Sequence, residues 1–392
     1  MVLSGTTPFF YTFAQNYSRV TKFVMDKTEA IENIETLSSE AISLLKQLIE
    51  TQSFSKEEEN TALLIEAFFK ERNIPFQRKK NNIWAFNQYF DSSKPTLLLN
   101  SHHDTVKPNK SWTLNPLEAQ VENGKLYGLG SNDAGGCLVS LMVTFSYFYH
   151  RQDLTYNIAI AATAEEEISG KEGLEIVVPE LPEISFAVVG EPTEMHLAVA
   201  EKGLLVLDCT AKGKSGHAAR EEGDNAIYKA LKDISWINSY QFPKVSPTLG
   251  PVKMSVTIIN AGTQHNVVPD VCNFTIDVRA TDQYTLEEII DIIQANIQSE
   301  VSARSIRLRP SSIPMDHPIV KAGLALGRNS YGSPTTSDQA LLDCPSLKMG
   351  PGHSGRSHSA DEFIYLHEIE EGIRQYITML EAVVVNDDRI FE

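Results

Sequence analysis

Apolar residues follow two alternating patterns along the first half of the chain. In one pattern they recur every three or four residues, which predicts helices over residues 37–50, 58–72 and about 135–150. In the other they form short unbroken runs, which predicts strands over residues 82–87, 95–101, 156–163 and 185–190. Unbroken runs are typical of strands that are buried on both faces of a largely parallel sheet. The pattern therefore predicts an α/β domain with helices on both faces of the sheet.

A second pattern begins after residue 202. It predicts strands over residues 203–212, 252–260, 271–279 and 305–309, with helices over residues 224–239 and 285–299. Four strands and two helices in about 110 residues make a compact α+β unit with a four-stranded sheet. Helices over residues 317–329 and 367–385 then resume the first pattern. The smaller unit is therefore expected to be inserted into the larger one.

Three segments follow from these patterns. Residues 1–36 form an N-terminal extension without clear periodicity, in which Met25 offers an alternative start. Residues 37–202 and 312–392 form the larger domain, and residues 203–311 form the inserted one. A length of 392 residues agrees with two domains, because single cores seldom grow that large.

Composition narrows the partners and the compartment. A net charge of -17 argues against nucleic acid, because phosphate binding needs clustered Lys and Arg. The four cysteines show no CxxC spacing, which indicates free thiols in a reducing compartment. No run approaches the roughly 18 apolar residues that span a bilayer, and the N-terminus lacks a secretory signal pattern. The sequence predicts a cytoplasmic protein that binds neither nucleic acid nor membranes.

Metal-ligand residue types stand at the ends of successive predicted strands. His102 follows the run Leu97–Leu99, the acidic triplet Glu165–Glu167 closes the strand over residues 156–163, and Glu191 follows Val188 and Val189. A lone His-x-Asp is usually a turn, and a lone Glu triplet is usually a solvated surface. Because the carboxyl ends of parallel strands meet at one edge of a sheet, their repetition there instead predicts a shared site.

The residue types fit a centre with two metal ions. Zinc takes imidazole nitrogen and carboxylate oxygen, and a two-metal site needs a bridging carboxylate. The five expected ligands, with Asp133 as the bridge, are His102, Asp133, Glu167, Glu191 and His358. Asp104 is expected to hold the second ring N–H of His102, and Glu166 to move a proton between water and the leaving nitrogen. His103 is expected to turn away from the metals.

Five motifs carry a resemblance to a known family. They are Ser101-His102-His103-Asp104-Thr105-Val106, Gly128-x-Gly130-x-x-Asp133-x-Gly135-Gly136, Thr163-Ala164-Glu165-Glu166-Glu167, Gly190-Glu191-Pro192-Thr193 and His358-x-x-Asp361-Glu362. From about residue 37 onwards the chain resembles the two-zinc amidohydrolases and exopeptidases that include acetylornithine deacetylase, succinyl-diaminopimelate desuccinylase and aminoacylase. The resemblance implies two Zn²⁺ ions, with Co²⁺ as a substitute, and the ligand and base roles given above. Ser101 and Gly135 depart from the family's frequent Gly and Lys, but no ligand is lost.

The resemblance also implies a substrate site that uses the inserted domain, through which the family dimerises. His217, in Lys214-Ser215-Gly216-His217, resembles a lid histidine that stabilises the tetrahedral oxyanion, often in the partner subunit; the alternative is a surface-loop histidine. Asn266 and Arg279 fall on positions that hold the substrate's carboxylate, although a structural Asp would serve Arg279 equally well. Further candidates for substrate binding are Thr336, Ser337 and Gly352.

Within the family the chain resembles the acetylornithine deacetylase branch. The expected reaction is hydrolysis of N-acetyl- or N-succinyl-L-ornithine to ornithine and a carboxylate, in arginine biosynthesis. A succinyl group would need one more cation, for which Lys202, Arg220 and Arg356 are candidates. One alternative is a succinyl-diaminopimelate desuccinylase or a dipeptidase. Another is a catalytically inactive binding homologue, which would be expected to have lost a ligand or the base.

Overall fold

A nine-stranded sheet forms the centre of the larger domain in this computed structural model, which describes residues 33–385. The strand order is β1-β2-β6-β3-β7-β17-β8-β15, with β16 beside β8. The central strands β6, β3, β7 and β17 run parallel, whereas β2 and β8 flank them in the antiparallel sense. The strands are β1 Phe76–Lys79, β2 Asn82–Phe86, β3 Thr96–His102, β6 Asn157–Thr163, β7 Ile184–Val189, β8 Leu197–Glu201, β15 Ser311–Ser312, β16 Ser330–Ser333 and β17 Ser346–Lys348.

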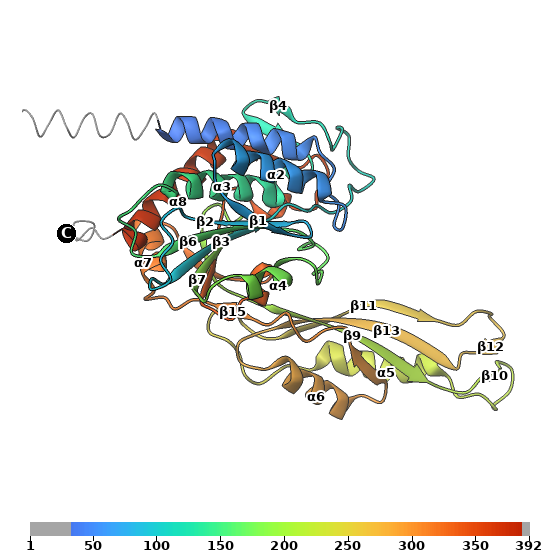
Figure 1. Cartoon of the computed structure of the whole chain (residues 1–392). Helices are drawn as coiled ribbons and strands as arrows, with labels where there is room; N and C mark the ends of the chain where they lie inside the picture. Colours follow the sequence, from blue (N-terminus) through green and yellow to red (C-terminus); the bar gives the residue numbers. More distant parts are fainter. Residues whose placement is uncertain (1–32, 386–392) are drawn as a thin grey trace, which may run out of the picture.

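Helices cover both faces of this sheet, as the sequence predicts. A helix over residues 33–49 lies with α2, α3 and α8 on one face, and the short α4 lies on the face toward the inserted unit (Figure 1). The helices are α2 Glu59–Glu71, α3 Gly136–Phe148, α4 Leu174–Val177, α7 Pro318–Ala325 and α8 Leu366–Val384. Helix α3 is apolar on nearly every side because neighbouring helices and the sheet enclose it.

The inserted unit has a four-stranded antiparallel sheet in the order β11-β13-β9-β14. Its elements are β9 Gly203–Lys212, α5 Ala226–Ser239, β11 Lys253–Ala261, β13 Val271–Ala280, α6 Leu286–Asn296 and β14 Glu300–Ala303. Both helices lie on the same face of the sheet (Figure 1), where the buried side chains of β9 alternate with less buried ones. Because all these elements fall between residues 203 and 303, we propose domain boundaries near residues 202 and 312.

Two small sheets complete the described chain. β4 Gln120–Glu122, β5 Lys125–Tyr127 and β18 Phe363–Tyr365 form one beside the larger domain. β10 Gly216–His217 pairs with β12 Val267–Val268 to form the other. This second pair lies at the end of the inserted unit that points away from the larger domain (Figure 1).

The strand predicted over residues 305–309 is wrong. The fourth strand of the inserted sheet is β14, which ends at Ala303 and pairs with Leu207–Thr210 of β9. The alternation of Ile306 and Leu308 with arginines resembles a strand. However, the regular ladder ends at Ala303, and a later bond, from the N–H of Leu204 to the carbonyl of Leu308 at 3.0 Å, precedes Pro310, which cannot donate a ladder hydrogen bond.

Two further expectations concern the ends of the chain and membranes. Residues 1–32 of the expected N-terminal extension lie outside the described residues, and residues 33–36 belong to the first helix. Within residues 33–385, no helix is both long and apolar enough to cross a bilayer.

Candidate active site

Three strand ends bring the central residues of the site together. His102 is the last residue of β3, which lies between β6 and β7 and runs parallel to both. The register places His102 beside Thr163, so Glu165–Glu167 begin at the same edge. On the other side, the N–H of Gly190 donates to the carbonyl of Asn100 at 2.7 Å, which fixes the start of the segment with Glu191. The parallel register therefore gathers groups that are far apart in sequence.

Four carboxylate and imidazole contacts define two adjoining groups. Nε2 of His102 lies 3.5 Å from Oδ1 of Asp133 and 3.8 Å from Oε1 of Glu191. Nε2 of His358 lies 3.6 Å from Oδ2 of Asp133 and 2.9 Å from Oε2 of Glu167. In each group of three, the ligand atoms lie within 4.8 Å of one another. Asp133 belongs to both groups and turns one oxygen toward each, which is the arrangement of a bridging ligand.

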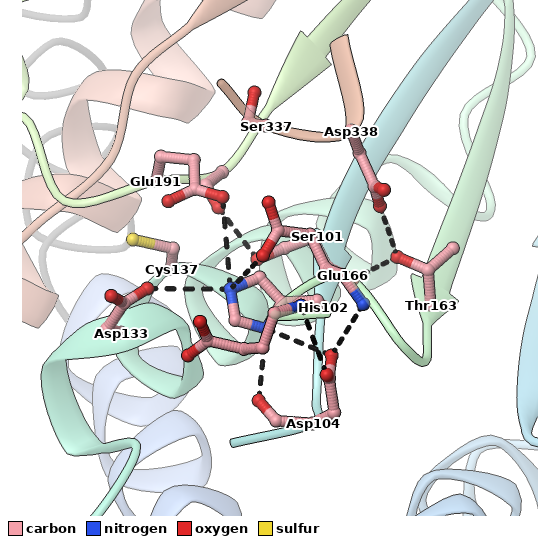
Figure 2. A network of polar contacts seen from close by, with 12 residues as sticks. Ser101, His102, Asp104, Asp133, Cys137, Thr163, Glu166, Glu191, Ser337 and Asp338 are labelled. Atoms are coloured by element: carbon pink, nitrogen blue, oxygen red, sulfur yellow. Dashed lines mark hydrogen bonds and ion pairs between the residues drawn. The ribbon is translucent and has the colours of Figure 1, made fainter. Parts of the chain in front are cut away.

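The donor set fits divalent metal ions. Nε2 of His102 is buried and has no hydrogen-bond partner among residues 33–385. A buried polar atom without a partner is unfavourable, so this nitrogen needs a ligand. Around it stand the carboxylates of Asp133, Glu191 and Glu166 (Figure 2). Burial raises the pKa of Glu191 to about 8, with a further increase from the charge of Asp133. A cation between these groups would satisfy the free nitrogen and offset the repulsion between the acids.

The two groups differ in their access to solvent. The side chain of His102 is 1% exposed, whereas that of His358 is 56% exposed. His102 therefore lies at the bottom of the site, and His358 lies at its rim.

Asp104 does more than orient His102. Nδ1 of His102 lies 3.0 Å from the backbone carbonyl of Asp104 and 3.4 Å from its Oδ1, so the backbone is the nearer acceptor. The carboxylate of Asp104 also accepts the N–H groups of Glu166 at 3.1 Å and Glu167 at 3.2 Å. Asp104 thus fixes both the imidazole and the turn that carries the two acids.

Glu166 stands apart from both groups of three but beside His102. Its Oε2 lies 3.9 Å from Nε2 of His102. Burial raises the pKa of Glu166 well above its usual value, although the charge of His102 opposes this shift. A carboxyl with a raised pKa, placed at the edge of the ligand set, suits proton transfer better than it suits tight binding of a metal.

Glu362 is a buried residue whose role the sequence did not reveal. Its carboxylate accepts the backbone N–H groups of Gly130 at 3.3 Å, Asn132 at 2.8 Å and Asp133 at 2.9 Å. Glu362 therefore holds the loop that presents Asp133. In the sequence, Glu362 was marked only by its place in the last motif, four residues after His358. The motif alone does not say which backbone groups Glu362 binds.

His103 points away from the metal groups, as strand alternation predicts. Its Nδ1 lies 2.9 Å from Oγ1 of Thr61, and its Nε2 lies 2.8 Å from the carbonyl of Asn81. Burial lowers the pKa of His103 to about 4, so the ring is neutral at pH 7.

Two of the substrate candidates meet where the inserted unit joins the larger domain. The guanidinium of Arg279 binds Asp277 at 2.9 and 3.1 Å, and its Nη1 donates to Oγ1 of Thr336 at 3.4 Å. Arg279 thus has the structural Asp that the sequence left as an alternative to a substrate carboxylate.

Two other candidates lie beside the metal groups. The hydroxyl of Ser337 (Figure 2) donates to the carboxylate of Glu201 at 2.8 Å. Glu201 also forms an ion pair with Lys348 at 2.9 Å. Gly352, at φ 89°, lies against Asn132, where a Cβ would be 2.5 Å from Oδ1. Ser337 is therefore already engaged, and the backbone of Gly352 approaches the loop that carries Asp133.

The structure does not bring His217 and Asn266 to the metal groups of their own chain. Both are exposed, and the β10–β12 pair that carries His217 lies at the far end of the inserted unit (Figure 1). There the carbonyl of Asn266 accepts the N–H of Ala218 at 2.9 Å, so the two loops are joined.

The three candidate cations for a succinyl group have other partners. Both Nη atoms of Arg356 bind Glu368, at 2.7 and 3.0 Å. Lys202 donates to the carbonyl of Pro251 at 2.7 Å, and the exposed Arg220 lies 3.8 Å from Glu222. None of these contacts is directed at the metal groups.

Comparison with known proteins decides the family. Residues 98–382 match the model of peptidase family M20/M25/M40. This chain belongs to that family. It is therefore a metal-dependent amidohydrolase, which confirms the enzyme class and the resemblance in the sequence.

Relatives within the family have different named activities. The chain is 28% identical to an acetylornithine deacetylase of Proteus mirabilis, over 84% of this chain and 93% of that protein. It is 25% identical to a succinyl-diaminopimelate desuccinylase of Psychromonas ingrahamii, over 88% of this chain and 99% of that protein. Both relatives match nearly end to end, so identity at this level does not choose between their substrates.

Solved structures of the family share the fold. A putative aminohydrolase from methicillin-resistant Staphylococcus aureus matches with a TM-score of 0.73 at 16% identity, covering 90% of this chain and 99% of that one. A dinuclear metal-binding peptidase of the M20 family from Bacillus subtilis matches with a TM-score of 0.65 at 16% identity, covering 89% and 98%. These likenesses confirm the α/β fold with a second, separate sheet.

Proposed function

We propose that this protein hydrolyses the amide of an N-acyl-L-ornithine, releasing ornithine and a carboxylate. The observation that carries the proposal is the shared Asp133, which joins His102 and Glu191 on one side to His358 and Glu167 on the other. This arrangement suits two metal ions, and one of the curated relatives is an acetylornithine deacetylase. The M20/M25/M40 family membership supports hydrolysis of an amide bond.

The proposed chemistry depends on a division of work between neighbouring acids. Divalent ions held by the five ligands would supply Lewis-acid chemistry, making a water more acidic and the scissile carbonyl more electrophilic. Glu166 takes a proton from the attacking water and returns it to the leaving nitrogen of ornithine. The carboxylate of Asp104 accepts the backbone N–H of Glu166 and so keeps Glu166 in place. The backbone carbonyl of Asp104 keeps the ring of His102 in one orientation.

The substrate is tested by steady-state assays on the metal-loaded protein. We expect kcat/KM for N-acetyl-ornithine or N-succinyl-ornithine to exceed that for N-succinyl-diaminopimelate by at least tenfold. In a bacterial arginine auxotroph that lacks acetylornithine deacetylase, expression of this chain should restore growth without arginine if N-acetyl-ornithine is the substrate. Negligible turnover of both ornithine derivatives would rule out the proposal.

A desuccinylase acting on diaminopimelate is the second candidate, because several relatives have that name at 24–25% identity. The same assays decide between the two candidates, since a higher kcat/KM for N-succinyl-diaminopimelate would favour the desuccinylase. A dipeptidase would instead release free amino acids from unblocked dipeptides. An inactive binding homologue is disfavoured because all five candidate ligands and Glu166 are present and clustered.

Zinc is the proposed metal, at two ions per chain, because imidazole and carboxylate are ligands that zinc accepts. Metal analysis of protein purified without chelators should give about two Zn²⁺ per chain. Removal with a chelator should abolish turnover, and either Zn²⁺ or Co²⁺ should restore it.

A homodimer through the inserted unit is the proposed assembly. Strand β11 is an edge strand of nine residues, and its Ile258 and Ile259 are 48% and 50% exposed. An exposed apolar edge strand is a surface that another strand readily pairs with. A dimer formed there would also let the exposed His217 and Asn266 of one chain act at the metal groups of the other. Ile259→Lys should shift the protein from dimer to monomer in sedimentation velocity.

A further inference from the structure

A large cavity lies between the two domains, beside the turn that begins at Glu165. Its volume is about 800 Å³, which is in the range of small-molecule sites. The larger domain contributes residues from the turns around Lys56, Lys80 and Glu165–Glu172, and the inserted unit contributes β9 and the chain after β14. None of the five candidate metal ligands lines the cavity, and neither does Glu166.

The charges in the cavity are mostly positive, although the protein as a whole has a net charge of -17. Five cationic side chains line it: Lys56, Lys80 and Lys171 from the larger domain, and Arg304 and Arg307 from the inserted unit. A concentration of one sign of charge in a cleft draws in ligands of the opposite sign.

Two of these cations, Lys56 and Lys171, have unused binding capacity, whereas Arg304 already binds Asp208 at 2.8 and 2.9 Å. Within residues 33–385, the ammonium groups of Lys56 and Lys171 have no ion pair or hydrogen bond. Arg307 binds Glu175 at 2.8 Å and the carbonyl of Ser169, but its buried Nε has no partner in the described chain. Lys80 lies 3.4 Å from Glu172, a loose pair at the same cavity wall.

Within the part of the chain that the structure describes, the acids of the cavity wall leave Lys56 and Lys171 unpaired, although Glu172 lies beside Lys80. Two of these acids are buried and face backbone groups: Glu58 accepts the N–H groups of Lys56 at 2.6 Å and Glu165 at 3.3 Å, and Glu165 accepts the N–H of Glu172 at 3.3 Å. Burial raises the pKa of Glu58 above its usual value.

Backbone strain is concentrated at the same wall. Lys56, Lys80, Glu165 and Ser169 have φ values of 75°, 57°, 57° and 48°, a region that side chains other than glycine seldom adopt. Such residues gather at binding sites more often than elsewhere, because the surrounding structure must hold them there. Two of the four are lysines of the cationic set.

The floor of the cavity is apolar. Leu204 and Val206 of β9 project from the sheet face without helices, and Leu308 and the half-exposed Ile168 complete the surface. We propose that this cavity is a binding site for a small organic anion with two negative groups and an apolar body. The negative groups pair with Lys56 and Lys171 of the larger domain, and the apolar body lies on β9 of the inserted unit.

The proposal predicts that such an anion bridges the two domains. A ligand favours a domain arrangement only when it binds that arrangement better than others, and contacts with both domains provide this difference. No candidate metal ligand lines this cavity, so the proposal does not depend on which amide is hydrolysed at the metal groups.

The test uses 1,5-naphthalenedisulfonate, which has two sulfonates on an apolar ring and coordinates zinc weakly. Isothermal titration calorimetry on the metal-loaded full chain should give one site per chain. Lys56→Ala with Lys171→Ala should weaken binding at least tenfold. The matched control, Lys232→Ala with Lys321→Ala, removes two exposed lysines outside the cavity and should leave binding unchanged. An absence of saturable binding up to millimolar probe, or equal losses in both double variants, would overturn the proposal.

Two further binding measurements test which features of the ligand the cavity recognises. Ethane-1,2-disulfonate, which lacks the apolar body, should bind at least tenfold more weakly, and equal binding would contradict the role of β9. Competition with isophthalate and with phenyl phosphate distinguishes a dicarboxylate from a phosphate ester, and displacement by neither counts against the proposal. Because each double variant should keep its amidohydrolase activity and thermal midpoint, a failure of binding is not confused with misfolding or with a wrong substrate.

Discussion

The metal centre and the far end of the inserted unit both carry residues expected at one active site, yet only the first is assembled within a single chain. At the metal centre, His102, Asp133 and Glu191 come from three parts of the sequence. One ligand atom of each lies within 4.8 Å of those of the other two. At the other end, His217 and Asn266 are exposed and are directed at no metal group of their own chain (Figure 1).

This difference has a physical origin. A parallel sheet must place the carboxyl ends of β3, β6 and β7 at one edge, so ligands at those ends meet without help from another element. The loops around β10 and β12 have no such constraint, because an antiparallel pair can extend away from the rest of the chain. If His217 and Asn266 act at the metal groups, they reach them from a second chain or through a movement of the inserted unit.

The largest expected effect is at the metal centre. Glu166→Gln keeps the size and polarity of the side chain but removes its ability to take up a proton. We expect kcat to fall by about 10³- to 10⁴-fold, near the upper end for general acid–base catalysis. Metal content, measured by plasma mass spectrometry, should stay unchanged.

Glu167→Gln is the matched control for the neighbouring position. Its Oε2 lies 2.9 Å from Nε2 of His358, so this change should weaken metal binding as well as turnover. A near wild-type rate for Glu166→Gln would contradict the assignment of the base.

The next effect tests whether the far end acts across a dimer. His217→Ala should lower kcat by about 10²-fold or more, as for loss of one oxyanion donor, with the metal content unchanged. Mixing His217→Ala chains with Glu166→Gln chains should then restore activity. Half of the randomly formed dimers contain one site with both residues intact, so about one quarter of the wild-type rate is expected for a dimer of two equal sites.

The outcome of the mixture separates two geometries. If the inserted unit instead closes over its own chain, no site in the mixed dimer has both residues, and activity stays at the level of the separate variants. Loss of metal from His217→Ala would contradict its assignment to the lid.

The sequence was sufficient to predict those parts that local patterns determine. Unbroken apolar runs placed β3, β6 and β7 to within one or two residues, and strand-end chemistry placed His102, Glu167 and Glu191 at a common edge. Strand alternation also separated His103 from His102. Each of these features depends on the period of a strand and on the side to which a side chain points.

The rest depends on contacts between distant segments. Glu362 holds the backbone of residues 130–133, and Asp104 holds the backbone of Glu166 and Glu167, but hydrogen bonds to main-chain groups leave no residue-specific mark in a sequence. The false strand over residues 305–309 has the same cause, because alternation cannot say where a partner strand ends. The interdomain cavity likewise exists only once the two domains are placed.

A smaller effect is expected at Glu362, which supports the metal centre without contacting its ligands' side chains. Glu362→Gln keeps one acceptor oxygen for the N–H groups of Asn132 and Asp133 but replaces the other, which accepts the N–H of Gly130, by an amide donor. We expect metal affinity to fall by about 10- to 100-fold, as for other groups that support a ligand. Competition with a chromogenic chelator measures this, and full recovery of kcat at saturating metal would show that the effect acts through Asp133.

The smallest expected effect distinguishes two neighbouring substrate candidates. The hydroxyl of Ser337 already donates to Glu201 of a buried ion pair, so Ser337→Ala should reduce the free energy of unfolding by about 1–3 kcal/mol. Its KM should change by less than threefold, because the hydroxyl is not free for substrate. Thr336 is the matched comparison, since its hydroxyl donates to the carbonyl of Lys202 at 2.8 Å but also accepts, at 3.4 Å, from Nη1 of Arg279, the candidate for the substrate carboxylate. Thr336→Val should raise KM more than Ser337→Ala does, and the reverse order would return Ser337 to the substrate site.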